Sequence, residues 1–154
     1  MRMPARCHRH VAHSRRVGDA VDVRFSRRPG TSGGYRRRMS ESTSECVFCW
    51  IVAGDIPASV IAETDHSVAF HDTDPKAPTH VLVIPRRHVE NLGALADHPD
   101  ELTDAVVLAR TVAAELGLED GYRLVANTGA RAHQTVFHAH LHVLGGREFS
   151  WPPG

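Results

Sequence analysis

The clearest alternation of apolar and polar positions lies near the end of the chain. His138, His140 and His142 occupy every second position, with Ala139 and Leu141 between them. Successive side chains of a β-strand point to opposite faces, so this pattern predicts a strand with three imidazoles on one face. The other face is expected to enter a core through Phe137, Ala139, Leu141 and Val143. Three histidines in alternation indicate a functional site, whereas a lone buried histidine more often belongs to the core.

The remaining pattern predicts four more strands and two helices. Apolar residues three and four positions apart between Asp100 and Leu116 predict one long amphipathic helix, which Gly117 ends. A short buried helix is predicted over residues 46–54. The predicted strands cover residues 60–63, 67–71, 80–85, 122–126 and the histidine segment 137–144. Short connections and a single long helix indicate an α+β domain with a five-stranded, mostly antiparallel sheet.

Charge divides the chain into two parts, although its formal net charge is zero. Residues 1–39 contain eleven arginines and two acidic residues, whereas residues 40–154 contain seven basic and sixteen acidic residues. Because the first part has few large apolar residues, we expect a disordered arginine-rich extension followed by one folded domain over residues 40–154. The extension could be an organelle-targeting segment, a nucleic-acid-binding tail or a misassigned start ahead of Met39. Its composition favours the last interpretation.

No run of eighteen apolar residues occurs, so no membrane span is expected, and the lack of a secretory signal favours a cytoplasmic protein. Cys46 and Cys49 have the spacing of half a zinc site, for which histidines could supply the remaining ligands. A redox dithiol has the same spacing, but the following elements do not alternate as in a thioredoxin-like domain. A catalytic zinc on the three histidines is disfavoured, because the outer two would lie about 13 Å apart along a strand.

Further motifs accompany the histidines. They are Cys46-x-x-Cys49, Ile56-Pro57, Ala69-Phe70-His71-Asp72, Ala77-Pro78-Thr79-His80, Val83-Ile84-Pro85, the segment from His142 to Arg147, and Trp151-Pro152-Pro153-Gly154. From Cys46 to the last residue the chain resembles the histidine triad (HIT) superfamily of nucleotidyl hydrolases and transferases. Within it, the motifs are similar to the purine nucleoside phosphoramidases, the HINT-type branch, in a zinc-binding, bacterial-like form. Histidine at position 142, where the transferases typically have glutamine, favours a hydrolase.

This resemblance implies a role for each histidine of the predicted site. His140 would attack the phosphorus of a purine nucleoside 5'-phosphoramidate, expel the amine and form a nucleotidyl-histidine that water then cleaves. A backbone carbonyl close to His138 would hold the other ring nitrogen of His140. His142 would donate to the phosphate, and His80 would support the proton network from the adjacent strand.

The resemblance also implies a nucleotide pocket, a zinc site and a homodimer. Asn127, Gln134 and Thr135 would donate to the phosphoryl oxygens, and Asp72 would accept the ribose hydroxyls. The base would be enclosed by the apolar side chains of Val47, Phe48, Ile51, Ile56 and Phe70. A structural Zn²⁺ would be held by Cys46, Cys49, His88 and His138. The dimer would join the sheets of two copies into one, through the long helix and the fourth strand.

Two other functions are also consistent with the sequence. A regulatory module that binds purine nucleoside monophosphates with little turnover would use the same pocket. Dinucleoside polyphosphate hydrolysis would use the same histidines, although the Trp-Pro-Pro-Gly terminus is typical of the phosphoramidases. Nucleic-acid binding by the extension is less favoured, and it predicts salt-sensitive binding that is lost when residues 1–38 are removed.

Overall fold

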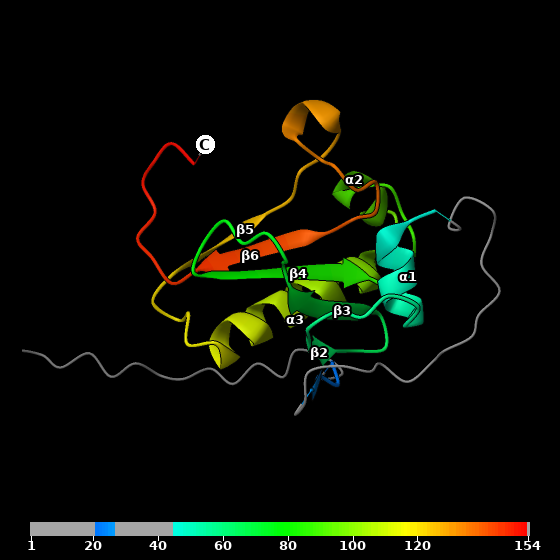
Figure 1. The fold of residues 1–154 in the computed structure, drawn as a ribbon, viewed down its shortest axis with the longest axis horizontal. Coiled ribbons are helices and arrows are strands. Elements are labelled where there is room, and N and C mark those ends of the chain that lie inside the picture. The colour runs from blue at the N-terminus through cyan, green and yellow to red at the C-terminus, as the bar shows by residue number, and fades with distance from the viewer. Residues whose placement is uncertain (1–20, 27–44, 154) are drawn as a thin grey trace, which may run out of the picture.

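The computed structural model describes residues 21–26 and 45–153 of the chain. These residues form one antiparallel sheet with the strand order β1-β2-β3-β4-β6-β5 (Figure 1). The strands are β1 (Arg24–Phe25), β2 (Val60–Glu63), β3 (Ser67–His71), β4 (Thr79–Pro85), β5 (Tyr122–Val125) and β6 (Leu141–Gly145). The helices are α1 (Val47–Ala53), α2 (Leu92–Leu95) and α3 (Pro99–Glu115), with a 3-10 turn, η2 (Ala130–Ala132). The predicted α+β class, antiparallel sheet and single long helix are confirmed.

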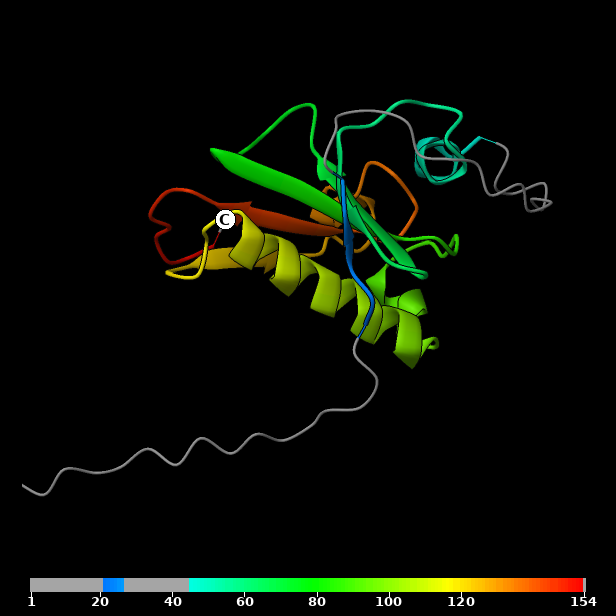
Figure 2. The same cartoon turned by 90° about the horizontal axis from the view of Figure 1, so that it is seen from below.

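The central strand β4 separates two apolar clusters because its side chains alternate between the faces of the sheet. Val81 and Val83 belong to the cluster that α3 covers, whereas Leu82 and Ile84 belong to the cluster that includes Phe48 of α1. Figure 2 shows α3 along one face of the sheet and α1 on the opposite side. The whole of β4 between these layers is buried, apart from its partly exposed first residue, as its nearly continuous apolar sequence predicts.

Helix α3 follows from its local sequence. Pro99 occupies the start of the helix, where the N–H that it lacks would have no helical partner. Two acidic residues in the first turn interact favourably with the positive end of the helix dipole. The apolar stripe packs against the sheet through Ala105, Leu108, Ala109, Val112 and Ala113, all of which are at most 1% exposed. The predicted long helix is thus confirmed, and its stripe faces its own sheet.

The structure differs from the predicted elements at three places. A sixth strand, β1, lies within the segment for which the charge pattern predicts an extension without structure, and the short helix α2 was not predicted. The rest of the predicted extension, residues 1–20 and 27–39, lies outside the described residues. The histidine strand begins at Leu141, four residues later than predicted. Phe137 consequently precedes the strand and is 46% exposed, so its assignment to the core was wrong.

Candidate functional site

His140 lies on the sheet face opposite α3, beside the ring of Phe48 on α1, at 5.4 Å between ring centroids. Its Nδ1 is 2.7 Å from the carbonyl oxygen of His138. Because a carbonyl oxygen can only accept, Nδ1 carries a proton, and in the neutral ring the lone pair is on Nε2. No hydrogen-bond partner for this Nε2 occurs among the described residues. The residue is 7% exposed, and the geometry leaves one ring nitrogen without a protein partner and available for chemistry.

His142 and His80 form a second hydrogen-bonded unit next to His140. The backbone N–H of Lys76 donates to His80 Nδ1 at 3.1 Å, so the proton of His80 lies on Nε2. His80 Nε2 is 2.8 Å from His142 Nδ1 and donates to it, which places the proton of His142 on its Nε2. That Nε2 is buried and has no partner among the residues that the structure describes. One backbone amide therefore sets both tautomers and leaves His142 with a free N–H donor.

Burial favours the neutral forms of His142 and His80. It lowers the pKa of His142 to about 4, with smaller contributions from the neighbouring His140 and His80. Burial also lowers the pKa of His80, while the carboxylate of Asp72 acts in the opposite direction. Asp72 Oδ2 lies 3.4 Å from His80 Nε2. Near neutral pH, His142 is therefore a neutral hydrogen-bond donor.

Most of the predicted base-binding residues gather beside His140. Phe48 makes edge-to-face contacts with Phe70 and with the ring of His140, at 5.9 and 5.4 Å between centroids. Val47 and Ile51 pack against the same apolar cluster. Ile56 is half-buried where its backbone N–H bonds to Trp50 after α1 ends. Helix α1 thus supplies an apolar wall to the site.

The loop before the histidines is organised by Gln134, which is 3% exposed. Its Oε1 accepts from the N–H of Gly129, and its Nε2 donates to the carbonyls of Glu90 and Val136. Both amide hydrogens are thereby used, so in this structure Gln134 orders the loop and has no donor free for a phosphate. Thr135 is exposed and Asn127, just after β5, is half-buried.

A second cluster combines two thiols with two imidazoles. Cys49 Sγ lies 3.2 Å from His88 Nδ1 and 3.6 Å from His138 Nδ1, and Cys46 Sγ lies 3.5 Å from His138 Nδ1. The four ligand atoms all lie within 4.8 Å of one another. Around a tetrahedral Zn²⁺ with bonds of about 2.1 Å to nitrogen and 2.3 Å to sulfur, such atoms would be roughly 3.5 Å apart. The cluster therefore has the composition and size of a closed zinc site.

The orientation of His138 supports this interpretation. Its Nε2 donates to the carbonyl of Pro85 at 2.9 Å, which leaves the lone pair on the Nδ1 that faces the cysteines. Burial lowers the pKa of His138 to about 4 and raises the pKa of the Cys49 thiol to about 12. In that environment a bound cation would supply the charge that a thiolate needs.

Sequence reasoning located both clusters but missed what fixes their protons. The carbonyls of His138 and Pro85 and the amide of Lys76 are backbone groups, which no residue pattern marks. The loop-ordering role of Gln134 was also missed, because side-chain type alone does not distinguish a ligand donor from a structural one.

In the described part of the chain, no helix combines the length and apolar character needed to cross a membrane.

Comparison with known proteins defines the class to which this fold and these histidines belong. The HIT domain family matches residues 53–149, and the chain is a member of that family. The 14 kDa zinc-binding protein of Zea mays is 40% identical over 131 residues, which cover 77% of this chain and 93% of that protein.

Two solved structures have the same fold. A HIT family hydrolase from Legionella pneumophila is 44% identical with a TM-score of 0.69, over 71% of this chain and all of that chain. A histidine triad nucleotide-binding protein from Candida albicans is 32% identical with a TM-score of 0.62, over 71% of this chain and 85% of that chain. The family resemblance stated from the sequence is thus confirmed.

Proposed function

We propose that this protein is a nucleotide-binding hydrolase that cleaves the P–N bond of purine nucleoside 5'-phosphoramidates through a nucleotidyl intermediate on His140. The observation that carries the proposal is the pair of unpartnered Nε2 atoms, a lone pair on His140 and an N–H on His142. A phosphoryl group needs both a nucleophile and a donor to its oxygens. The names of the Legionella and Candida structures, a hydrolase and a nucleotide-binding protein, support this class.

In the proposed reaction, His140 Nε2 forms a bond to phosphorus while the P–N bond breaks, and the departing amine takes a proton from water. His142 Nε2–H donates to a phosphoryl oxygen, and His80 holds His142 in the tautomer that can do so. Water then attacks phosphorus and breaks the bond to Nε2, which releases the nucleoside monophosphate and neutral His140. The carbonyl of His138 stabilises the positive imidazole of the intermediate through Nδ1–H.

The surrounding residues would bind the nucleotide. Phe48, Phe70, Val47, Ile51 and Ile56 would enclose the purine, and the Asp72 carboxylate would accept from the ribose hydroxyls. Asn127 and Thr135 would donate to the phosphate, whereas Gln134 would act indirectly by ordering their loop. The expected ligands are purine nucleoside monophosphates and their phosphoramidates.

The Cys46, Cys49, His88 and His138 cluster would hold Zn²⁺ with four protein ligands. Such a site has no open position, so the ion would be structural and would tie α1 to the catalytic segment. The name of the Zea mays relative, a zinc-binding protein, supports this part of the proposal.

A homodimer would form through α3 and β5. Val106 of α3 and Leu124 of β5 are large apolar side chains that are 42% and 39% exposed, and association of two copies would bury them. Trp151 is 85% exposed and would reach the site of the second copy. A cytoplasmic location is the accompanying prediction, which fractionation of cells would test.

Intact-mass measurement after brief mixing with an adenosine phosphoramidate tests the mechanism. The wild-type protein should gain the mass of one adenosine monophosphoryl group, and His140→Asn should gain none and release amine at least about 100-fold more slowly. His66→Asn, at an exposed turn histidine, is the matched control and should behave as wild type. Nucleotide binding without an adduct or amine release, in folded wild-type protein, would instead favour a regulatory binding module.

A further inference from the structure

The outer edge of β2 is covered by residues 21–26. Arg24 pairs with Glu63 and Phe25 with Ala62 in an antiparallel register. The N–H of Ser26 donates to the carbonyl of Ile61 at 2.8 Å, which continues the same register by one residue. Backbone pairing of this kind adds a strand to a sheet edge without requiring a particular side-chain sequence.

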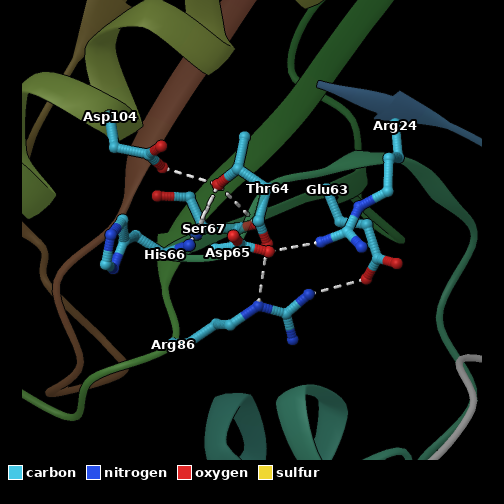
Figure 3. Close-up of polar contacts among 8 residues, drawn as sticks. All are labelled: Arg24, Glu63, Thr64, Asp65, His66, Ser67, Arg86 and Asp104. Atoms are coloured by element: carbon cyan, nitrogen blue, oxygen red, sulfur yellow. Dashed lines mark hydrogen bonds and ion pairs between the residues drawn. The ribbon is translucent and has the colours of Figure 1, made fainter. Parts of the chain in front are cut away.

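Side chains give this added strand its specificity. Arg24 Nη2 lies 2.6 Å from Asp65 Oδ1, next to the pair that Arg86 makes with Glu63 (Figure 3). Val23, on the opposite side of the strand from Arg24, packs against the apolar cluster under α3. The edge therefore recognises an extended segment with a valine on one face and a cation on the other.

We propose that the edge of β2 is a strand-docking site, and that the chain's own residues 21–26 occupy it in cis as a latch. An unpaired sheet edge is a template for association with other chains. With the latch docked, the outer strands of the described sheet are β1, which has two residues, and β5, which has four. A very short outer strand is a poor template for further pairing, so the latch favours sheet-to-sheet assembly at β5. This inference is independent of the catalytic proposal.

Two further observations favour the chain's own segment as the occupant. The 18 residues between Ser26 and Glu45 can span up to roughly 60 Å, which allows docking in cis from the start of α1. A tethered segment also has a millimolar effective concentration, which a second copy does not reach in dilute solution. Residues 21–26 lie outside the segment 53–149 that matches the HIT domain.

Engineered cysteines in the full-length protein test the register. Arg24 and Glu63 are opposite each other in a hydrogen-bonded pair, a geometry with Cα atoms about 5.5 Å apart that suits a disulfide. Arg24→Cys with Glu63→Cys should form an intramolecular disulfide at least about tenfold faster than Asp22→Cys with Glu63→Cys, which is two residues out of register. Peptide mapping by mass spectrometry separates this bond from bonds to the native cysteines.

Equal rates for the two cysteine pairs would overturn the latch, because a free tail forms both bonds without preference. A disulfide between two chains in dilute protein would show that a second copy occupies the edge, and would overturn the cis assignment. Hydrogen exchange adds a test without cysteines. Protection of the Ser26 amide should fall with Arg24→Glu or Asp65→Arg and return when both changes are combined, whereas Arg16→Glu, the control for charge alone, should leave it unchanged.

Discussion

The tautomer of His142 depends on a group that is distant in the sequence, the backbone amide of Lys76. The alternation of histidines predicted three imidazoles on one face of a strand, whereas in the structure only His142 lies within β6 and His140 precedes it on the same side of the sheet. It could not assign their protons, because these depend on the amide of Lys76 and the carbonyl of His138. At the residue scale, the sequence predicted the histidines of the site, whereas the fold determines which of their ring nitrogens carries a proton.

The neutral state of His142 predicts a dependence of stability on pH. In the unfolded chain this imidazole takes up a proton below about pH 6.5, whereas in the folded protein its pKa is lowered to about 4. The unfolded state therefore binds more protons between these values, so the free energy of unfolding decreases as the pH falls from about 6.5 to 4. We expect His142 to contribute a loss on the order of 2 kcal/mol, allowing for its partial exposure.

Denaturant unfolding at several pH values measures this loss. His142→Gln keeps a hydrogen-bonding side chain but cannot titrate, so its stability should vary less steeply over the same pH range. The wild-type protein and this variant would show parallel curves if His142 were already protonated at neutral pH.

At the scale of elements, the turn between β2 and β3 is attached to α3 by a buried polar contact. Thr64 Oγ1 donates to Asp104 Oδ2 at 2.6 Å and accepts from the N–H of Ser67 at 2.8 Å. Figure 3 shows these side chains in one view with the ion pairs of Arg24 with Asp65 and of Arg86 with Glu63. Asp104 is 4% exposed, and among the described residues the Thr64 hydroxyl is the hydrogen-bond donor to its carboxylate.

Removing that hydroxyl should destabilise the protein. Thr64→Val leaves the Asp104 carboxylate and the turn amides without their partner, which should cost about 2–3 kcal/mol of unfolding free energy. Thr64→Ser keeps the hydroxyl and should cost about 1 kcal/mol for the lost methyl group. Ser67→Ala is a useful control, because the Ser67 hydroxyl is buried without a partner among the described residues and its loss should be nearly neutral. Thermal or urea unfolding of the three variants measures the differences.

The sequence predicted the strands β2 to β5 within one residue at each end, because apolar alternation or a continuous apolar run marks them directly. Helix α2 escaped because four residues are too few to show a helical period, although Asn91 caps it. The predicted start of β6 was too early because a tertiary hydrogen bond precedes the strand. The N–H of Ala139 donates to the carbonyl of Val89 at 2.7 Å, so the chain joins β4 only after the first two histidines.

At the scale of the whole molecule, the cysteine–histidine cluster connects α1, the segment after β4 and the segment before β6. If Zn²⁺ holds these three parts together, its removal should cost at least about 3 kcal/mol and lower the melting temperature by roughly 10 °C. Titration with a chelator during thermal unfolding measures the shift. Cys49→Ala should already have the lower melting temperature and should not respond to the chelator, whereas Cys7→Ser should respond as wild type does.

His138 gives this architecture an evolutionary consequence, because its side chain and its main chain perform different tasks. The ring faces the two cysteines, and the carbonyl accepts from Nδ1 of His140, the proposed nucleophile. A peptide carbonyl is present whatever the residue type. A lineage that loses the thiols could therefore exchange this imidazole for another buried side chain and still inherit a correctly aimed His140, so the first histidine is the member of the triad most free to diverge.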